Sequence, residues 1–433
     1  MKIIYNIFFT IFFFLSAPYY FIKLLRRGNW KSKFPERFGI YDKSVKDELR
    51  GKNKKIWIHA VSVGEANIAI RLIKDLSQKL PGYNFVISTT TSTGMEVLCK
   101  NLPENIIKIY YPVDFPFCVN RAVNTISPEL IVIVEAEIWP NLLWTAEKRN
   151  IPVALVNARL SEKSYRGYKR FGFIFRQLFS KFSAVGCQDE FDQQRLIELG
   201  CNPQNITITG NIKFDAAYPP KEAKLDAHKL LKQIGVSPEV PILIGGSTHN
   251  GEEEILAKIA QKLRAKRKDL FLILVPRHFE RTKEVETVLK NLNMPYILRT
   301  EINELLKISC PPQCLLVNTT GELRDFYRCA TVVFVGKSLT AKGGQNPIEP
   351  AALGKPIIFG PNMQNFSAIA RAFLEGKAAI QVSNADELEK AIDTLLENPE
   401  QRKKLGENAI KVIQKNSGAV MKTIDMLCKL IET

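Results

Sequence analysis

The feature that most constrains the fold is a repeated alternation between short apolar runs and stretches with helical spacing. Its first copy covers Lys55–Leu80, where the apolar run Ile56–Val61 precedes apolar side chains at near-helical intervals. The apolar runs do not alternate with polar residues, which indicates strands buried on both faces and therefore parallel sheets covered by helices. The sequence thus predicts an α/β protein.

The alternation occurs in two series, which predict two Rossmann-like domains facing each other across a cleft. Asp215–Lys224 separates the series and contains two adjacent prolines, so residues 215–224 are predicted to be a linker. The domains are then 28–214 and 225–433, with Asn398–Glu432 as a terminal helical segment of the second. The predicted strands are Ile56–Val61, Asn84–Thr89, Ile106–Tyr111, Leu130–Val134, Pro152–Asn157, Ser183–Cys187 and Ile206–Gly210, then Ile242–Gly246, Phe271–Val275, Pro295–Leu298, Cys314–Val317, Thr331–Val335, Pro356–Gly360 and Ala378–Val382.

Residues 1–27 are predicted to form a membrane-anchor helix. Ile3–Ile22 is almost wholly apolar and aromatic, close to the ~20 residues that span a bilayer. Basic residues follow from Lys23 onwards, whereas a cleaved signal peptide carries its positive charge before the apolar run. The positive-inside rule then keeps the rest of the chain in the cytoplasm. A helix lying in the membrane interface is the alternative.

Composition favours an anionic partner. The 433 residues carry a formal net charge of +17, which suits nucleic acid, an acidic membrane surface or phosphorylated small molecules. The eight cysteines show no paired framework and no metal-ligand spacing with the four histidines. We therefore expect no metal site and a reducing compartment.

Glu65 is the first candidate for chemistry. Ser62-Val63-Gly64-Glu65 joins a predicted strand to a predicted helix, and ligands of open α/β folds bind at such helix starts. Ser-x-x-Glu before an apolar run is also a capping box, in which both side chains satisfy free backbone N–H groups. Spacing alone leaves both interpretations open.

Charged residues also follow two other strands of the first series. Glu135 and Glu137 come directly after Leu130–Val134, where a carboxylate is costly unless it is paired or used. An extended chain would place these two side chains on the same side. Lys213 follows Ile206–Gly210, and a solvated loop lysine is its alternative interpretation.

The second series repeats the strand-to-helix device. Thr319-Thr320-Gly321-Glu322 and Asn346-Pro347-Ile348-Glu349 each follow a strand and are predicted to begin a helix, whose free N–H groups attract phosphate. Pro276-Arg277 follows Phe271–Val275, and an arginine there suits bidentate phosphate contact or a surface ion pair. The alternative for the two helix starts is capping alone.

Leu160–Phe182 mixes basic and aromatic side chains. This composition suits single-stranded nucleic acid, a phosphorylated lipid at a membrane surface, or an ordinary helix with its aromatic residues in the core. The N-terminal anchor favours the lipid.

Taken together and in chain order, these segments resemble the Kdo (3-deoxy-D-manno-oct-2-ulosonic acid) transferases of lipopolysaccharide assembly, glycosyltransferase family 30. The resemblance implies a GT-B fold and metal-independent, inverting transfer of Kdo from CMP-Kdo to a lipid A precursor, lipid IVA, without a cofactor. It also implies a single-pass protein of the inner membrane with cytoplasmic domains. The matching segments are Ser62–Glu65, Val134–Leu142, Val156–Ser161, Thr209–Asp215, Ser247–Glu253, Leu274–Arg281, Thr319–Leu323 and Gly343–Pro350.

The resemblance also assigns roles to residues. It implies that Glu65 is the general base and that Glu135 and Lys213 stabilise the transition state. Where the family has a Gly-Gly pair this chain has Gly336-Lys337, and Gln345 replaces the family's histidine. The residues implied to hold CMP are Pro276, Arg277, Thr320, Gly321, Glu322, Asn346, Pro347, Ile348 and Glu349.

Three other functions are weighed against this one. An enzyme of the same architecture could act as a sugar-nucleotide epimerase, or transfer to a different lipid-linked acceptor. A basic nucleic-acid-binding protein would explain the charge of +17, but it would give Glu65 no special role. The apolar Ile3–Ile22 segment argues against a soluble epimerase, whereas a nucleic-acid-binding protein would show strong, salt-dependent binding to any polynucleotide.

Overall fold

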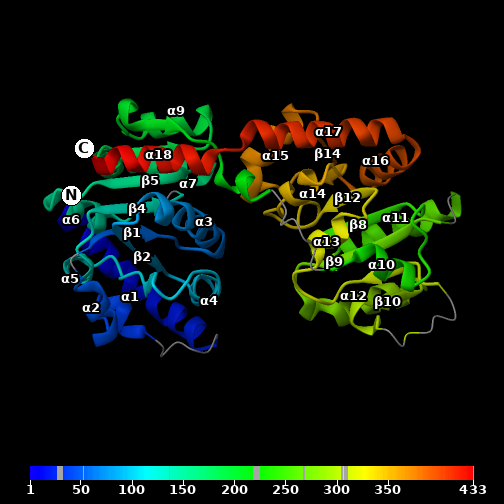
Figure 1. Cartoon of the computed structure of the whole chain (residues 1–433), viewed down its shortest axis with the longest axis horizontal. Helices are drawn as coiled ribbons and strands as arrows, with labels where there is room; N and C mark the ends of the chain where they lie inside the picture. The colour runs from blue at the N-terminus through cyan, green and yellow to red at the C-terminus, as the bar shows by residue number, and fades with distance from the viewer. Residues whose placement is uncertain are drawn as a thin grey trace. The chain divides into compact units, whose positions relative to one another are not determined.

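A computed structural model describes residues 1–26, 33–51, 53–135, 137–217, 225–266, 269–303, 306 and 311–432, with no side chains described for 19–26. The chain divides into two compact units (Figure 1). Unit 1 comprises Met1–Ile212 and Gly418–Thr433, and unit 2 comprises Lys213–Ser417.

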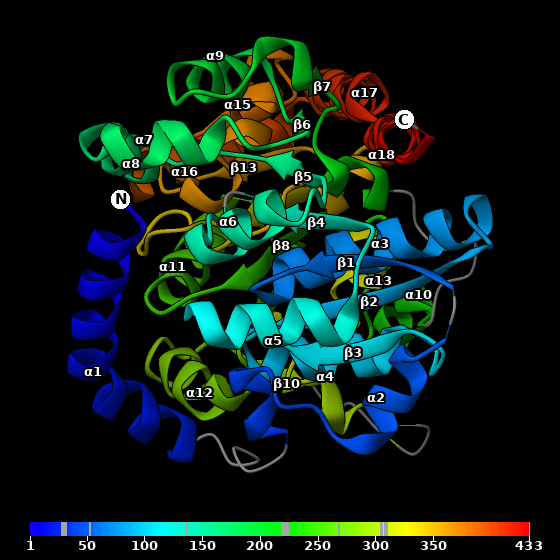
Figure 2. The same ribbon diagram turned by 90° about the vertical axis from the view of Figure 1, so that its left-hand side faces the viewer.

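Unit 1 is built on a seven-stranded parallel sheet with the order β3-β2-β1-β4-β5-β6-β7 (Figure 2). Each strand overlaps one of the apolar runs predicted from the sequence, although β1 begins and ends two residues earlier than predicted. All five residues of β4 are buried, as a strand covered on both faces requires. The strands are β1 (Lys54–His59), β2 (Tyr83–Thr89), β3 (Ile107–Tyr110), β4 (Leu130–Val134), β5 (Val153–Ala158), β6 (Ala184–Cys187) and β7 (Ile206–Ile208).

Successive strand residues feed two separate cores, one on each face of this sheet. Trp57 and Ile131 pack into one core, whereas Ile56 and Val132 pack into the other. The helices of unit 1 are α1 (Lys2–Arg26), α2 (Lys43–Leu49), α3 (Val63–Lys79), α4 (Ser92–Asn101), α5 (Pro116–Ile126), α6 (Pro140–Lys148), α7 (Glu162–Arg170), α8 (Gly172–Phe179), α9 (Glu190–Glu198) and α18 (Ala419–Glu432), with 3₁₀ helices at Phe34–Phe38 and Pro203–Asn205.

The last helix differs from the predicted domain boundary. Residues 225–433 were expected to form one domain, but α18 packs in unit 1 against α3 and β6. Its apolar stripe, which includes Val420, Ile424 and Leu427, is buried in the same core as Ile56. Full burial of such a leucine contributes roughly 1.5–3 kcal/mol, so the return of the chain to unit 1 is strongly favoured.

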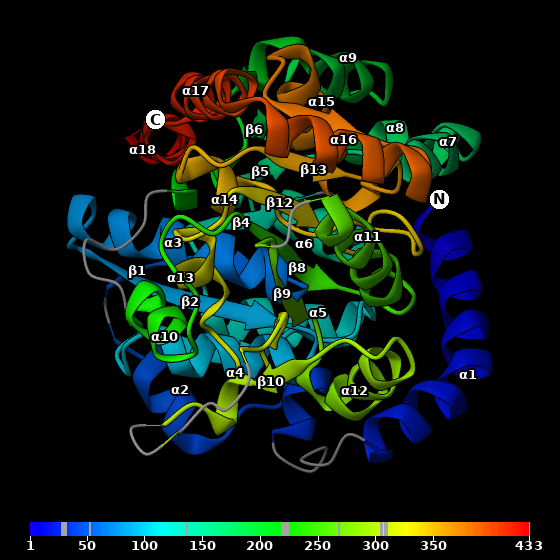
Figure 3. The same ribbon diagram turned by 90° about the vertical axis from the view of Figure 1, so that its right-hand side faces the viewer.

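Unit 2 repeats the design with a second seven-stranded parallel sheet, ordered β10-β11-β9-β8-β12-β13-β14 (Figure 3). Every predicted strand of the second series is present, with ends that differ from the prediction by at most two residues. The strands are β8 (Ile242–Thr248), β9 (Phe271–Pro276), β10 (Tyr296–Leu298), β11 (Cys314–Leu316), β12 (Val332–Val335), β13 (Ile357–Phe359) and β14 (Ala379–Gln381).

The sheet of unit 2 also separates two cores. Ile242 and Ile273 face one core, and Leu243 and Leu272 face the other. The helices are α10 (Ala227–Gln233), α11 (Glu252–Lys266), α12 (Thr282–Asn291), α13 (Leu323–Tyr327), α14 (Ile348–Ala352), α15 (Ser367–Glu375), α16 (Ala385–Glu397) and α17 (Pro399–Asn416), with 3₁₀ helices at Ile212–Ala217, Phe279–Arg281, Arg299–Glu301 and Gln364–Phe366.

Helix α1 has one face on the protein and one in solvent (Figure 2). Tyr5, Phe9 and Phe13 stack on aromatic rings of unit 1 or on each other. Among the residues that the structure describes, no helix combines the length and the apolar character needed to cross a membrane. In the part of α1 whose side chains the structure describes, residues 2–18, the large exposed apolar side chains are Ile3, Ile4, Ile7, Phe8, Ile11, Phe12, Phe14 and Leu15.

Candidate active site

Glu65 lies in the first turn of α3, where β1 leads into the helix. Ser62 caps α3: its Oγ accepts a hydrogen bond from the Glu65 N–H at 3.3 Å and donates to Glu65 Oε1 at 2.9 Å. The Val61 N–H donates to Glu65 Oε2 at 2.8 Å. The capping interpretation is therefore confirmed.

The cap does not exhaust the chemistry of Glu65. Burial raises the pKa of this carboxyl from its ordinary 4.5 to about 7; the Val61 hydrogen bond opposes the shift and the charge of Glu135 adds to it. A carboxylate has about four lone-pair sites, so hydrogen bonds from Val61 and Ser62 leave capacity for a further proton. A group with a pKa near 7 suits general-base chemistry at neutral pH.

Glu135 and Glu137 join Glu65 at the carboxyl edge of the unit 1 sheet. Both carboxylates act electrostatically on Glu65, and burial together with Glu135 raises the pKa of Glu137. Arg159 Nη2 lies 3.7 Å from Glu135 Oε2, which gives this carboxylate a cationic neighbour. The premise of an extended chain here was wrong: β4 ends at Val134, and Glu135 turns the backbone with φ +59°.

Lys213 belongs to unit 2, whereas the predicted boundary placed it in the first domain. It lies in the 3₁₀ helix Ile212–Ala217, and its Nζ is 5.8 Å from the centre of the Phe366 ring. The preceding residue remains tied to unit 1, because the Ile212 N–H donates to Asn157 Oδ1 at 3.0 Å. The change from one unit to the other therefore falls directly before Lys213.

In unit 2, Arg277 and Glu349 lie close together at the carboxyl edge of the sheet. Arg277 follows β9, and its N–H donates to the Thr248 carbonyl at 3.0 Å. Burial raises the pKa of Glu349, which the charges of Arg324 and Arg277 and a hydrogen bond from Asn346 oppose. This edge therefore holds two guanidinium groups around one half-buried carboxylate.

The predicted helix start at Asn346 is present in modified form. Asn346 Oδ1 accepts from the Ile348 N–H at 3.1 Å, as a capping side chain does, and Asn346 Nδ2 donates to Glu349 Oε1 at 3.4 Å. Helix α14 begins at Ile348, immediately after Pro347, rather than at the proline itself.

The Thr319–Glu322 turn is less helix-like than predicted. Thr319 Oγ1 donates to Glu322 Oε2 at 2.5 Å, but α13 begins only at Leu323. Glu322 also forms an ion pair with Arg299, at 3.1 Å between Nε and Oε2. Gly321 has φ +86° and open space around its Cα, so Thr320 and Gly321 form an exposed turn at this edge.

Glu252 has a role that the sequence did not reveal. It is fully buried at the start of α11, and its carboxylate accepts from the backbone N–H groups of His249, Lys337, Ser338 and Leu339 at 2.6–3.0 Å. Lys337 adopts φ +54°, a conformation that favours glycine. This geometry explains why a second glycine would suit the position, and it shows that lysine is accommodated there.

Arg299 and Arg324 were also missed. Arg299 directly follows β10, a position that could have indicated it, whereas Arg324 lies within α13. The described part of the chain holds no group of three or more His, Cys, Asp or Glu side chains arranged to hold a metal ion. Cys310 lies outside the described residues, and the other seven cysteines are free thiols.

The basic and aromatic stretch Leu160–Phe182 is partly core and partly surface. Phe179 and Phe182 are buried in unit 1, whereas Phe171 and Phe173 are exposed.

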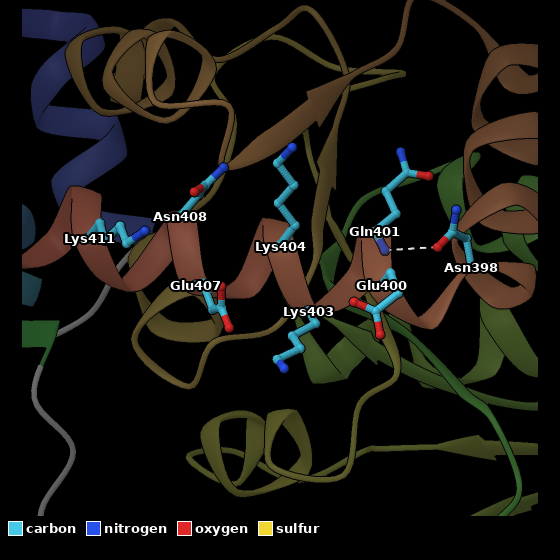
Figure 4. Close-up of a pocket in the computed structure, with 8 residues that line it drawn as sticks. All are labelled: Asn398, Glu400, Gln401, Lys403, Lys404, Glu407, Asn408 and Lys411. Carbon is cyan, nitrogen blue, oxygen red and sulfur yellow. Dashed lines mark hydrogen bonds between the residues drawn. The ribbon is translucent and has the colours of Figure 1, made fainter.

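A separate hollow runs along α17 (Figure 4). Polar and charged side chains between Asn398 and Lys411, all on or just before this one helix, line the hollow, and none of them belongs to the predicted site.

Comparisons with known proteins agree with this architecture. The family model described as 3-Deoxy-D-manno-octulosonic-acid transferase (kdotransferase) matches residues 32–216, and the model Glycosyl transferases group 1 matches residues 298–412. The 3-deoxy-D-manno-octulosonic acid transferase of Haemophilus influenzae is 36% identical over 417 residues, which is 95% of this chain and 95% of that protein. The protein of the same name from Rickettsia bellii is 30% identical over 429 residues, 96% of this chain and 97% of its own length.

A solved structure shares the two-domain fold. UDP-GlcNAc 2-epimerase from Neisseria meningitidis, bound to UDP-GlcNAc, has a TM-score of 0.59 at 16% identity, covering 87% of this chain and 100% of that chain. Similarity at this level of identity concerns the α/β fold alone.

Proposed function

Since the chain belongs to the family of 3-deoxy-D-manno-octulosonic acid (Kdo) transferases, we propose that it transfers Kdo from CMP-Kdo to the lipid A precursor lipid IVA, with inversion, at the cytoplasmic face of the inner membrane. The observation that carries the chemical part of the proposal is the buried carboxyl of Glu65, whose pKa is about 7. It lies at the carboxyl edge of a parallel sheet, where α/β enzymes bind their ligands.

The proposed reaction forms one bond and breaks another. Glu65 takes the proton of the acceptor hydroxyl while that oxygen bonds to the anomeric carbon of Kdo. The bond from that carbon to the phosphate oxygen breaks, and CMP leaves with the electron pair. Glu135 and Lys213 stabilise the charge distribution of the transition state, and Arg277 balances the anionic leaving group. The cationic side chains allow the reaction to run without a metal ion.

Donor binding is assigned to the carboxyl edge of the unit 2 sheet. Two arginines, Arg277 and Arg324, lie around Glu349 there, and an arginine fork matches phosphate geometry. The N–H groups and side chains at the starts of α13 and α14 supply further polar contacts. The proposed CMP-contacting residues are Pro276, Arg277, Thr320, Gly321, Glu322, Asn346, Pro347, Ile348 and Glu349.

A transfer assay with a donor-site variant tests the proposal. The wild-type protein is expected to convert CMP-Kdo and lipid IVA into a Kdo-bearing lipid, detected by mass spectrometry. Arg277→Ala should weaken CMP binding about 10–100-fold by calorimetry, because a hydrogen bond to a charged group contributes roughly 1.5–3 kcal/mol. Lys390→Ala, on the exposed side of α16, is the control for loss of one positive charge. Absence of product from wild type, or unchanged CMP affinity in Arg277→Ala, contradicts the proposal.

We propose further that the exposed face of α1 lies in the membrane interface. Phe8 and Phe12 are 68% and 62% exposed, one turn apart on this apolar face. An amphipathic helix of this kind buries its apolar face at the boundary between headgroups and acyl chains. The opposite face already packs on unit 1 through Tyr5 and Phe9.

The double variant Phe8→Ser/Phe12→Ser is therefore expected to bind vesicles at least about 10-fold more weakly than wild type. Co-sedimentation with vesicles of phosphatidylethanolamine and phosphatidylglycerol measures the effect. Phe279→Ser, which removes a 48% exposed phenylalanine of unit 2, should bind like wild type. Equal vesicle binding by the double variant and wild type would rule out this face as the membrane contact.

A further inference from the structure

The carboxylate of Asp114 joins α1 to the start of α6. Asp114 is fully buried between β3 and α5. Its Oδ2 accepts from the Tyr5 hydroxyl of α1 at 2.9 Å and from the Asn141 N–H at 3.0 Å, while Oδ1 accepts from the Leu142 N–H at 3.3 Å. One side chain thus satisfies two free N–H groups of α6 and holds α1 against them.

A second set of contacts reinforces this connection. Asn141 Nδ2 donates to the Asp114 carbonyl at 2.5 Å and to Asn6 Oδ1 of α1 at 2.8 Å. The Tyr5 ring packs edge-on against Trp144 of α6, with 5.7 Å between ring centres. The polar face of α1 therefore contacts α6 specifically, through groups that an ordinary apolar anchor would not need.

The start of α6 is also the end of the acidic segment of the candidate active site. Glu135, Glu137 and Trp139 lie between the end of β4 and the first residue of α6. Trp139 packs on Tyr111 with 5.1 Å between ring centres, and Tyr111 stacks at 3.9 Å on His59, the last residue of β1. The position of α6 therefore affects the positions of two loops, the one that follows β4 and the one that follows β1.

We propose that α1, through Tyr5 and Asp114, positions the acidic segment that carries Glu135 and Glu137, and so forms part of the support of the active site. Tyr5 and Asp114 are positioning residues, because neither reaches the reacting atoms. This inference rests on the proposed transfer reaction. It assigns the two faces of α1 different tasks: the apolar face contacts lipid and the polar face orients α6.

A water-soluble acceptor separates these tasks. With CMP-Kdo and a deacylated lipid A-type disaccharide, membrane affinity no longer contributes to the rate. Tyr5→Phe should lower kcat about 10-fold with the KM for CMP-Kdo unchanged, because small displacements of catalytic groups cost this much or more. Tyr296→Phe is the matched control: it also removes a tyrosine-to-carboxylate hydrogen bond, to Glu286 at 2.7 Å in unit 2. It should leave kcat unchanged.

The conservative replacement of Asp114 adds a test of the mechanism. Asp114→Ala removes every acceptor of its side chain, whereas Asp114→Asn keeps one oxygen for the N–H groups of α6. We expect Asp114→Asn to restore kcat at least several-fold relative to Asp114→Ala. Hydrogen exchange at the amides of Asn141 and Leu142 should be faster in Tyr5→Phe and Asp114→Ala than in wild type.

The outcomes of the two proposals can be distinguished. If wild type transfers no Kdo, the proposed function fails, yet hydrogen exchange at Asn141 and Leu142 still tests the connection to α1. If wild type transfers Kdo and Tyr5→Phe retains its kcat and its exchange rates, the positioning role is overturned. A Tyr5→Phe defect seen only with membrane-bound acceptor likewise overturns it.

Discussion

Replacing Glu65 by glutamine is expected to lower kcat by about 10²–10⁴-fold, the usual contribution of a general base. Glutamine keeps one carbonyl oxygen, which can still accept from the Val61 N–H, and its NH₂ group can donate to Ser62 Oγ. The helix start therefore survives while the proton acceptor is lost. CMP affinity should stay at the wild-type value, because the proposed donor residues all belong to unit 2.

Ser62→Ala is the matched control that separates the cap from the base. It removes the side chain that caps α3 but keeps the Glu65 carboxylate. Loss of such a cap costs about 1 kcal/mol of stability, so its midpoint of unfolding should fall. Its kcat should fall far less than that of Glu65→Gln. Equal losses of kcat in the two variants, or near-normal transfer by Glu65→Gln, would return Glu65 to a purely structural role.

The pH profiles of wild type and Glu65→Gln test the role of Glu65 as general base. Since burial raises the pKa of Glu65 to about 7, kcat/KM of wild type should rise about tenfold per unit below that pH and level off above it. Stability should change in the opposite direction. The folded-state pKa lies above the ordinary 4.5, so the contribution of this group to stability is complete below pH 4.5 and is lost as the pH rises through about 7. Glu65→Gln should remove both dependences.

The two sheets could be predicted from the sequence because a strand buried on both faces consists almost entirely of apolar residues. Leu130–Val134 contains no polar residue and could only be a doubly covered strand or part of a buried helix, and its short length indicated the strand. The cap at Ser62 was accessible for a similar reason, since its partner Glu65 is three residues away. Both features are local.

Features that depend on residues far away along the chain could not be predicted from the sequence. The spacing of Val420, Ile424 and Leu427 shows that α18 has an apolar face, but not that this face packs on α3 in unit 1. Glu252 lies 85 residues before Lys337, and no periodicity connects a carboxylate to backbone N–H groups that far along the chain.

Helix α1 lies between these cases. Its apolar character dominates the sequence and favoured a membrane span. The polar side chains of Asn6 and Thr10, four residues apart, mark the face that packs on unit 1. Tyr5 lies beside this stripe, and its hydroxyl finds Asp114 at 2.9 Å. The composition of α1 indicated a helix suited to lipid. Only these few polar residues indicated which face of the helix packs on the protein.

Glu252→Ala is expected to destabilise unit 2 more than any surface substitution, by about 3–5 kcal/mol. The replacement leaves four backbone N–H groups without their acceptor, and each buried donor left unpaired costs roughly 1–3 kcal/mol unless water reaches it. For a unit of this size, 1 kcal/mol corresponds to about 2–4 °C, so calorimetry should show a Tm lower by about 6–20 °C.

The same helix supplies the control for Glu252. Glu254 also lies in the first turn of α11, but its side chain is 48% exposed and pairs with Lys258 one turn later. An exposed pair of this kind contributes about 0.3–0.5 kcal/mol, so Glu254→Ala should shift the Tm only slightly.

The N–H groups that Glu252 holds belong to Lys337, Ser338 and Leu339, in the loop that leads from β12 toward Asn346 and α14. CMP affinity should therefore fall in Glu252→Ala even at temperatures where unit 2 remains folded. A Tm and CMP affinity equal to those of Glu254→Ala would show that this buried carboxylate does not organise the loop.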